Sequence, residues 1–394
     1  MKNWRRLDMR SEWTKKKLSD IADFNPRETI KKGAVAKKIS MDVLRPFYRD
    51  IPYYVEECFS SGTKFRNGDT IMARITPCLE NGKTAQVSIL NDGEVGFGST
   101  EYIVFRAKEG TANKDYLYYL VCSPEVREPA IKSMVGSSGR QRVQTDVVKN
   151  LEIDVPPLVD QEKIGLFLKS FDDKIALNDK INKNLLEQVT ALYKHRFIEL
   201  QPFNGTMPDD WHLGTVSEIT ELHDSKRIPL SSRERADLAK IYPYYGATSV
   251  MDYVDRYLFD GIYLLLGEDG TVVDSKGFPI LQYVEGKFWV NNHAHIITGR
   301  NGFSVELLYL LFSLTSVQSI VTGAVQPKIS QANLNKVPVI IPSEAELKAF
   351  DATIQPIFTQ IRNLRAENDR LATTRDTLLP KLMSGELDVS DIDL

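Results

Sequence analysis

The sequence predicts a mixed α/β protein with a pseudo-two-fold tandem repeat: two similar globular domains separated by two long helices that pack as an antiparallel coiled coil. Three observations lead to this fold class. Short motifs of the first half recur in the second half in the same order. Each half ends in a long helical pattern with the same apolar register. Strand-like and helix-like periodicities are also mixed within each half.

The repeat has a period of about half the chain. The segment "RVQTDVVKNLEIDVPP" (142–157) matches "KISQANLNKVPVIIPS" (328–343), so that Pro156 corresponds to Pro342 at an offset of 186 residues. Upstream, "DYLYYLV" (115–121) matches "ELLYLLF" (306–312) at an offset of 191. Because the offset shrinks toward the C-terminus, the second copy lacks a few residues between these anchors, and loops tolerate such deletions best.

Apolar residues at alternating spacings of three and four mark both helical patterns as the a/d seam of a coiled coil. The second pattern repeats the first at an offset of 186, so Asn182 and Asn368 are equivalent; a buried asparagine in a seam fixes its register. The globular segment between the helices returns the chain, which predicts an antiparallel pair; two unrelated amphipathic helices are the alternative. Asn178 falls in the same series, and the predicted seam residues are Ile164, Leu168, Phe171, Ile175, Asn182, Leu185, Ile354, Ile357, Ile361, Asn368, Leu371 and Leu378.

The globular segments mix the two periodicities. Residues 113–135 and 304–321 have a helical period. Strand-like runs are "DTIMARI" (69–75), "EYIVFRA" (101–107), "GIYLLLG" (261–267) and "KFWVNNHAHIIT" (287–298). We therefore predict a first globular domain at 1–157, a first long helix at 158–200, a second globular domain at 201–343, and a second long helix with the C-terminal tail at 344–394.

Composition and charge restrict the class of protein. The sequence shows no apolar run long enough to span a membrane, and its start lacks the apolar core of a signal peptide. Three cysteines without a C-x-x-C pair argue against a disulfide framework or a zinc knuckle, so we expect a cytoplasmic protein. Residues 1–150 carry 26 basic and 19 acidic side chains, whereas the remainder carries 24 and 34. The basic first part favours either a polyanionic partner or a solvated lysine surface.

Familiar catalytic motifs are incomplete in this sequence. Gly82-Lys83-Thr84 ends like a phosphate-binding loop, but Pro77 stands where the first glycine is required and supplies no N–H donor. The segment "DVPPL" (154–158) is the nearest approach to an adenine methyltransferase motif, and no aromatic residue follows its prolines. We therefore expect no catalytic residue in this chain.

Two alternative functions and one candidate metal pair remain open from the residues alone. A stand-alone nuclease could hold Mg²⁺ with the carboxylates of a Glu-x-Lys cluster, formed by Asp269, Asp274, Glu285 and Lys287. A coiled-coil interaction protein unrelated to DNA is the other alternative. His293 and His295 are two residues apart, on one face of a predicted strand. Without a third ligand, a polar surface strand is favoured over a metal site.

Several segments occur together and in one order. They are "MARITPCLENGKTAQV" and "GFGSTEYIVFRA" in the first half, "YYGATSVMDYVDRYLFDGIYLLLGEDG" and "FWVNNHAHII" in the second, and the terminal "LLPKLMSGELDV". With these segments the chain resembles the specificity subunit of type I restriction–modification enzymes over nearly its whole length. The resemblance implies two target-recognition domains, each reading one half of a split double-stranded DNA target, and two helices that set the unread gap. Because the two halves differ outside the anchors, the target should be asymmetric.

The resemblance also implies partners and cofactors. Two modification subunits, which are adenine methyltransferases, would dock on the helices, and restriction subunits that carry a motor and a nuclease would join them. These partners would bind S-adenosylmethionine, ATP and Mg²⁺, so we expect no cofactor and no metal on this chain. The acidic second half departs from an ordinary DNA-binding protein, which predicts weak DNA binding by the chain alone.

By the same resemblance, we predict residues that contact DNA in both halves. Arg74 and Lys83 would reach phosphates or guanine edges, with Gly82 admitting a close backbone approach; solvated surface charges are the alternative. Asn291, Asn292 and His293 would read bases, since asparagine pairs well with adenine. The segment "GSSGRQR" (136–142) and its counterpart "TGAVQPK" (322–328) would contact phosphates through Ser137, Arg140, Arg142, Gln326 and Lys328.

Overall fold

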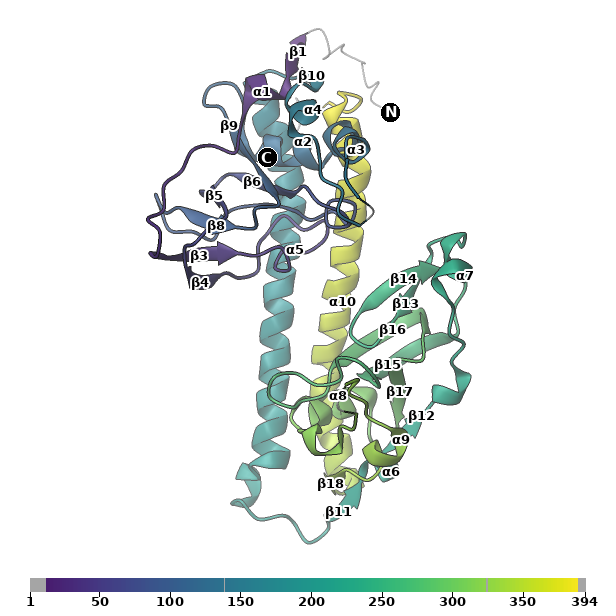
Figure 1. The fold of residues 1–394 in the computed structure, drawn as a ribbon. Helices are drawn as coiled ribbons and strands as arrows, with labels where there is room; N and C mark the ends of the chain where they lie inside the picture. The colour runs from purple at the N-terminus through teal and green to yellow at the C-terminus, as the bar shows by residue number, and fades with distance from the viewer. Residues whose placement is uncertain (1–11, 138, 324, 389–394) are drawn as a thin grey trace, which may run out of the picture. The chain divides into compact units, whose positions relative to one another are not determined.

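The structure is a computed structural model that describes residues 12–137, 139–323 and 325–388 (Figure 1). The chain divides into two compact units. The first unit contains the residues up to Lys180 and those from Leu364 onward, and the second unit is Ile181–Asn363. Both boundaries fall inside the two long helices, α5 (Leu158–Tyr193) and α10 (Glu344–Met383). Each unit therefore combines one globular domain with a part of each helix.

The first domain contains two four-stranded sheets. One has the order β2-β9-β6-β7 and is antiparallel, and the other has the order β4-β3-β8-β5, in which β3 and β8 are parallel. Their strands are β2 (Ala22–Phe24), β3 (Val35–Ile39), β4 (Val55–Cys58), β5 (Thr63–Phe65), β6 (Thr70–Ala73), β7 (Thr84–Gln86), β8 (Gly96–Gly98) and β9 (Tyr102–Ala107). A separate pair, β1 (Thr14–Lys17) with β10 (Glu152–Val155), brings the start of the domain beside the strand that leads into α5.

Four short helices complete the first domain: α1 (Leu18–Ile21), α2 (Lys114–Cys122), α3 (Pro124–Lys132) and α4 (Thr145–Lys149). The side chain of Asn113 accepts hydrogen bonds from the first free N–H groups of α2, which fixes where this helix begins. Buried tyrosine and leucine side chains of α2 pack in one core with Ile164 and Leu168 of α5 and with Leu379 and Leu382 of α10. This core joins the domain to its parts of both long helices.

The second domain has one six-stranded sheet with the order β12-β17-β15-β16-β13-β14. Its strands are β12 (Thr220–Leu222), β13 (Tyr242–Tyr245), β14 (Val250–Val254), β15 (Phe259–Gly267), β16 (Leu281–Val290) and β17 (Ala294–Gly299), with β11 (His212–Thr215) and β18 (Pro338–Ile341) as a separate pair. Its α-helices are α6 (Val216–Ile219), α7 (Ser232–Ala236), α8 (Val305–Ser313) and α9 (Gln331–Leu334). The apolar helix α8 is almost entirely buried in the core of this unit.

The strand pairings of the two domains correspond. The parallel pair β3·β8 has its counterpart in β13·β16, and the antiparallel pairs β2·β9, β6·β9 and β1·β10 have theirs in β12·β17, β15·β17 and β11·β18. The mixed α/β class and the tandem repeat are thus confirmed.

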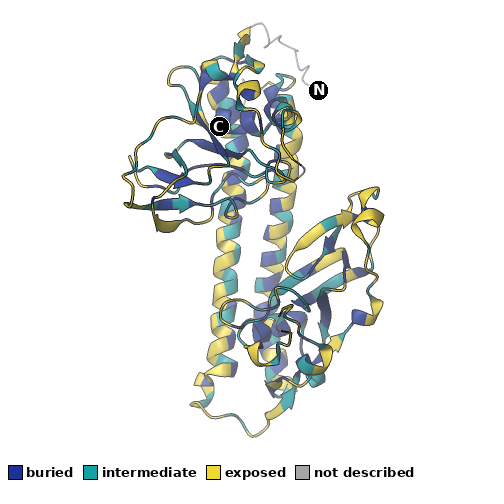
Figure 2. Cartoon of the chain, viewed as in Figure 1, coloured by how far each residue is buried: buried dark blue, intermediate teal, exposed yellow. Residues whose placement is uncertain are grey.

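Contacts between α5 and α10 show their direction within each unit. In the first unit Asp172 contacts Arg375 and Asn178 contacts Asn368, so the partner number falls as the α5 number rises. In the second unit the rings of Tyr193 and Phe350 lie 6.0 Å apart. The helices are therefore antiparallel. Buried and exposed residues alternate along both of them (Figure 2), as expected for helices with one packed face.

Candidate nucleic-acid interface

Two exposed loops occupy equivalent places in the two domains. The first loop, residues 136–141, is closed by Val135 and Arg142, whose backbones exchange hydrogen bonds of 3.0 and 2.9 Å. The second loop, residues 323–327, is closed in the same way by Thr322 and Lys328, with hydrogen bonds of 2.8 and 2.7 Å. One position in each loop, 138 and 324, lies outside the described residues, and the closing hydrogen bonds belong to other residues. Arg142 also forms a β-bridge with Ile75, which follows the central strand β6, and Lys328 forms a β-bridge with Asp269, which follows the central strand β15. The two loops are therefore counterparts in the repeat.

The basic residues that close the loops are bound to acidic residues of their own domain. The Arg142 guanidinium donates to both oxygens of Glu101, at 2.6 to 3.0 Å, and these hydrogen bonds lower the pKa of Glu101. The Lys328 ammonium lies 3.2 Å from a carboxylate oxygen of Glu268. Both cations thus orient the base of a loop, whereas Ser137, Arg140 and Gln326 lie exposed toward the tips.

Lys83 and Arg74 have partners inside the first domain. The Lys83 ammonium donates to the carbonyl of Met41 at 2.8 Å, and the Arg74 guanidinium donates to the carbonyl of Val143 at 3.3 Å. Gly82 has φ +75°, and a Cβ there would lie 2.5 Å from the ring of Phe47. The "GKT" segment is therefore an internal turn, and the Lys83 ammonium is bound to a backbone carbonyl of its own domain, which does not match the predicted DNA contact.

Asn291, Asn292 and His293 connect β16 to β17. Asn291 is buried, its amide N–H₂ contacts the sulfur of Met251, and its amide oxygen accepts the backbone N–H of His293 at 2.8 Å. Asn291 therefore shapes the connection and is not placed to read a base, which corrects the prediction. Asn292 is exposed, and the His293 ring is hydrogen-bonded to Asp269.

His295 is fully buried, so the prediction of a polar surface strand is wrong at this position. Its two ring nitrogens lie 2.6 Å from Asp224 Oδ2 and 2.8 Å from the carbonyl oxygen of Ile329. Asp224, Glu268 and His295 converge closely, but Arg227 and Gln331 donate to these same carboxylates. Protein donors thus take the positions that a cation would need, and the group is a hydrogen-bond network.

The acidic members of these networks, Glu101, Glu268 and Asp224, are not among the predicted site residues. Glu101 directly precedes β9, Glu268 directly follows β15, and Asp224 lies two residues beyond β12. An acidic residue beside the end of a buried strand is the one local signal that could have indicated them.

The Glu-x-Lys cluster of a nuclease is not assembled. Glu285 pairs with Arg362 of α10, and the Lys287 ammonium lies over the ring of Tyr257. Asp274 accepts backbone N–H groups of its own loop. In the register of β15 and β16, Glu285 faces Ile262, which lies five residues before the end of β15. Asp269 follows that end, so Glu285 is about 17 Å along the strand from the end at which Asp269 lies. The nuclease alternative is therefore not supported.

The predicted seam residues lie on the packed sides of the two helices. Ile164, Leu168, Ile175, Ile354, Ile361 and Asn368 are buried, and Phe171, Asn182, Leu185, Ile357, Leu371 and Leu378 are half-buried. In the first unit Asn178 donates to the amide oxygen of Asn368 at 2.9 Å, and Asn368 donates to Asp179 at 2.9 Å. Asn368 is therefore hydrogen-bonded in the seam, with Asn178 and Asp179 as its partners.

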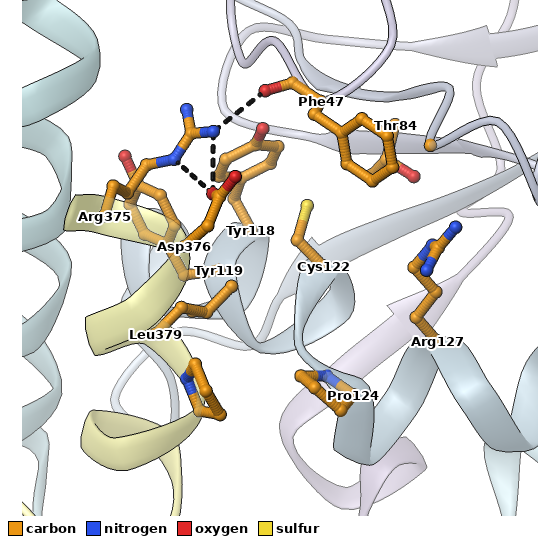
Figure 3. Close-up of a pocket in the computed structure, with 12 residues that line it drawn as sticks. Phe47, Thr84, Tyr118, Tyr119, Cys122, Pro124, Arg127, Arg375, Asp376 and Leu379 are labelled. Carbon is orange, nitrogen blue, oxygen red and sulfur yellow. Dashed lines mark hydrogen bonds and ion pairs between the residues drawn. The ribbon is translucent and has the colours of Figure 1, made fainter. Parts of the chain in front are cut away.

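A cavity of about 220 Å³ lies in the first unit between α2, α10 and the turn at Gly82 (Figure 3). Figure 3 shows the Arg375 guanidinium at its edge, donating to the carbonyl of Phe47 and to Asp376. Burial raises the pKa of the Cys122 thiol, which also lines the cavity, to about 12. A thiol with so high a pKa is a poor nucleophile at neutral pH, so this cavity does not present a catalytic cysteine.

None of the helices in the described part of the chain combines the length and the hydrophobicity that crossing a membrane requires.

Known proteins resemble this chain along most of its length. The sequence model of the family described as "Type I restriction modification DNA specificity domain" matches residues 10–187 and 208–372. The type I restriction enzyme MjaIX specificity subunit of Methanocaldococcus jannaschii is 25% identical over 311 residues, which cover 72% of this chain and 71% of that protein. The HindI specificity subunit of Haemophilus influenzae is 21% identical over 470 residues, which cover 96% and 100%.

The fold is also found in a crystal structure of the S subunit of a type I restriction–modification system from M. genitalium. It has a TM-score of 0.52 at 16% identity, and the match covers 94% of this chain and 96% of that one. The repeated family match includes both domains and most of both long helices. The chain therefore belongs to the family of type I restriction–modification DNA specificity subunits.

Proposed function

We propose that this chain reads a split, asymmetric double-stranded DNA target for a type I restriction–modification complex, with one half-site for each domain and no catalysis of its own. The observation that carries this proposal is the pair of equivalent exposed loops. They share one closing geometry, but their sequences, "GSSGRQ" and "GAVQP", differ. A shared scaffold with different tips fits two half-sites of different sequence.

The tips and bases of the loops would have separate roles. Arg140 would bind phosphate. Contacts of this kind position a protein on DNA without reading its sequence. Gln326 offers an amide that both donates and accepts hydrogen bonds. Arg142 and Lys328, which are held by Glu101 and Glu268, would act mainly by fixing the loop bases.

Two modification subunits would dock on the long helices and bring S-adenosylmethionine, and restriction subunits would bring ATP and Mg²⁺. In support, the part of α5 in the first unit exposes the apolar side chains of Leu166 and Leu177, which are 50% and 51% exposed. Residues eleven apart lie on nearly the same face of a helix. Exposed apolar side chains on one face fit a surface that a partner protein covers.

The proposal is tested by expressing this chain with its modification subunit and mapping methylated adenines across host DNA. The expected result is one split motif with a gap of fixed length. No new methylation, with both proteins folded and the methyl donor present, would refute the proposal and favour the DNA-independent interaction protein.

A sharper version uses Arg140→Ala in the same complex. This change should weaken DNA binding roughly uniformly across sequences and reduce the salt slope of the binding constant by about 1, as expected for one lost phosphate contact. Lys132→Ala is the matched control, because Lys132 is an exposed cation of the same domain with a 78% exposed side chain. Equal behaviour of the two variants would remove the first loop from the interface.

A further inference from the structure

At the base of each loop a side chain is hydrogen-bonded to a backbone carbonyl, and this side chain is an arginine in the first domain and a histidine in the second. Val143 and Ile329 each follow a loop-closing residue, and their N–H groups donate to the backbone carbonyls of Arg74 and Glu268 at 2.9 and 2.8 Å. They are therefore equivalent positions. The carbonyl of Val143 accepts from the Arg74 guanidinium at 3.3 Å, whereas that of Ile329 lies 2.8 Å from His295 Nε2.

The first domain has no counterpart of His295. In the register of β15 and β17, His295 faces Leu266; in that of β6 and β9, the corresponding residue Ile103 faces Met72. The surroundings correspond as well, because the Asn25 side chain accepts the N–H of Val104 and the Asp224 side chain accepts that of Ile296. Where the second copy has a buried ionisable ring, the first copy has an isoleucine.

The hydrogen bonds of His295 require a proton on both ring nitrogens. A carbonyl oxygen such as that of Ile329 can only accept, so Nε2 must donate. Asp224 also acts as an acceptor, since it receives the Ile296 N–H at 2.9 Å and the Gln331 amide. Both oxygens of Asp224 thus accept hydrogen bonds, and His295 Nδ1 lies 2.6 Å from Oδ2. This arrangement of acceptors on both sides of the ring fits an imidazolium that donates from both nitrogens.

Charges of both signs surround this ring. Glu268 Oε2 lies 3.8 Å from Nδ1. Arg227 contacts Glu268 at 2.6 Å and Asp224 at 3.5 Å, and Lys328 contacts Glu268 at 3.2 Å. His293, in the connection that leads into β17, is hydrogen-bonded to Asp269. The two carboxylates favour the imidazolium, while the two cations compete for them.

We propose that doubly protonated His295 is a positioning residue that holds the second loop in its DNA-reading conformation. As the pH rises, Nε2 loses its proton to solvent while Nδ1 keeps its proton toward the Asp224 carboxylate, so the hydrogen bond to the Ile329 carbonyl is lost. The second loop is then released, and recognition of the second half-site alone weakens. The first half-site keeps its recognition because arginine stays charged throughout the range in which histidine changes charge. The effect on recognition rests on the proposed function, since the loop must contact DNA for its release to matter.

We call the hydrogen bond from His295 Nε2 to the Ile329 carbonyl the clamp of the second loop. It is tested by hydrogen exchange and mass spectrometry on the full chain in complex with its modification subunits. The pH runs from about 5.5 to about 8.5, the range in which histidine titrates. Relative to peptides of the first loop, which correct for the intrinsic pH dependence, those spanning 322–330 should lose protection at least about tenfold as the pH rises, as for a lost hydrogen bond to a charged donor. Parallel behaviour of the two loops would overturn the inference.

Two further measurements keep this test independent of a single variant. His295→Gln should remove the pH dependence of the second loop, whereas His212→Gln, at a 61% exposed histidine on β11, should leave it unchanged. If His295→Gln does not fold, nitrogen NMR of the unaltered protein decides the matter. The His295 ring should be doubly protonated at neutral pH, and a neutral ring would overturn the inference.

Methylation mapping at the two ends of the same pH range separates the clamp from the proposed function. The expected result is a motif whose second half becomes degenerate at high pH while its first half stays unchanged. A released second loop with an unchanged motif would show that this loop does not read DNA, and would overturn that role even though the clamp exists. Absence of any split motif would refute the proposed function instead.

Discussion

Replacing Arg375 by methionine tests how much stability the first unit loses when a buried carboxylate is left without its ionic partner. The side chains of Arg375 and Asp172 are only 8% and 5% exposed, and they form a direct ion pair. Tyr119 also donates to the Asp172 carboxylate at 2.5 Å. Without the arginine, Asp172 keeps one neutral donor for a full charge in the core. Burial already raises the pKa of Asp172 in the unaltered protein, so protonation of this carboxyl is the expected response.

The expected loss follows from two independent considerations. Breaking a buried pair by removing one partner costs about 3 to 5 kcal/mol. Neutralising a carboxyl with an ordinary pKa of about 3.9 at pH 7 costs about 4 kcal/mol, which sets a ceiling on the first figure. Part of this cost is already present, because the pKa is raised before the change. We therefore expect Arg375→Met to lower the free energy of unfolding of the first unit by about 3 kcal/mol at pH 7.

The pH dependence of this loss identifies its cause. If the folded variant holds a proton on Asp172 that the unfolded chain releases, folding takes up one proton between pH 5 and pH 7. The deficit should then shrink by about 1.4 kcal/mol for each unit that the pH falls. Urea unfolding followed by hydrogen exchange reports peptides of the first unit separately. The double variant Asp172→Asn with Arg375→Met should recover most of the loss. A deficit that is constant from pH 5 to pH 7 would refute this reasoning.

Three further predictions concern other sites. Replacing both Asn178 and Asn368 by leucine should stabilise the first unit by about 1 kcal/mol or more but reduce the fidelity of helix pairing, because a polar layer specifies register at a cost in stability; urea unfolding and native mass spectrometry measure the two effects. Gly82→Ala should cost about 2 kcal/mol, since φ is +75° and the new Cβ meets Phe47; an unchanged urea midpoint would show that the turn relaxes. Although burial opposes it, a lysine and an arginine lower the pKa of Asp252 to about 2, so this group stabilises the fold above pH 4 and loses that contribution as the pH falls toward 2. Asp252→Asn should therefore cost about 2 kcal/mol at pH 7 and progressively less below pH 4, and a gap that stays constant in acid would contradict this.

The candidate interface could be predicted only in part. The repeat indicated the segments 136–142 and 322–328, and these form equivalent exposed loops. The family resemblance together with residue type suggested that Lys83 and Asn291 face DNA, whereas their polar atoms contact Met41 and Met251 within the chain. A lysine or an asparagine has the same composition signal whether its partner is a phosphate or a backbone carbonyl, so only the neighbours in space distinguish the two.

The sequence by itself determined the tandem repeat, the mixed α/β class and the two long helices, because hydrophobic periodicity and helix signals are properties of neighbouring residues. The tertiary structure decided which polar groups meet. Asp172 and Arg375 are 203 residues apart, Arg74 and Val143 are 69 apart, and His295 and Ile329 are 34 apart. No local pattern encodes such pairs, since folding brings their atoms within hydrogen-bonding distance only after strands and helices have packed. The different clamps of the two loops, an arginine in one copy and a histidine in the other, belong to this second group.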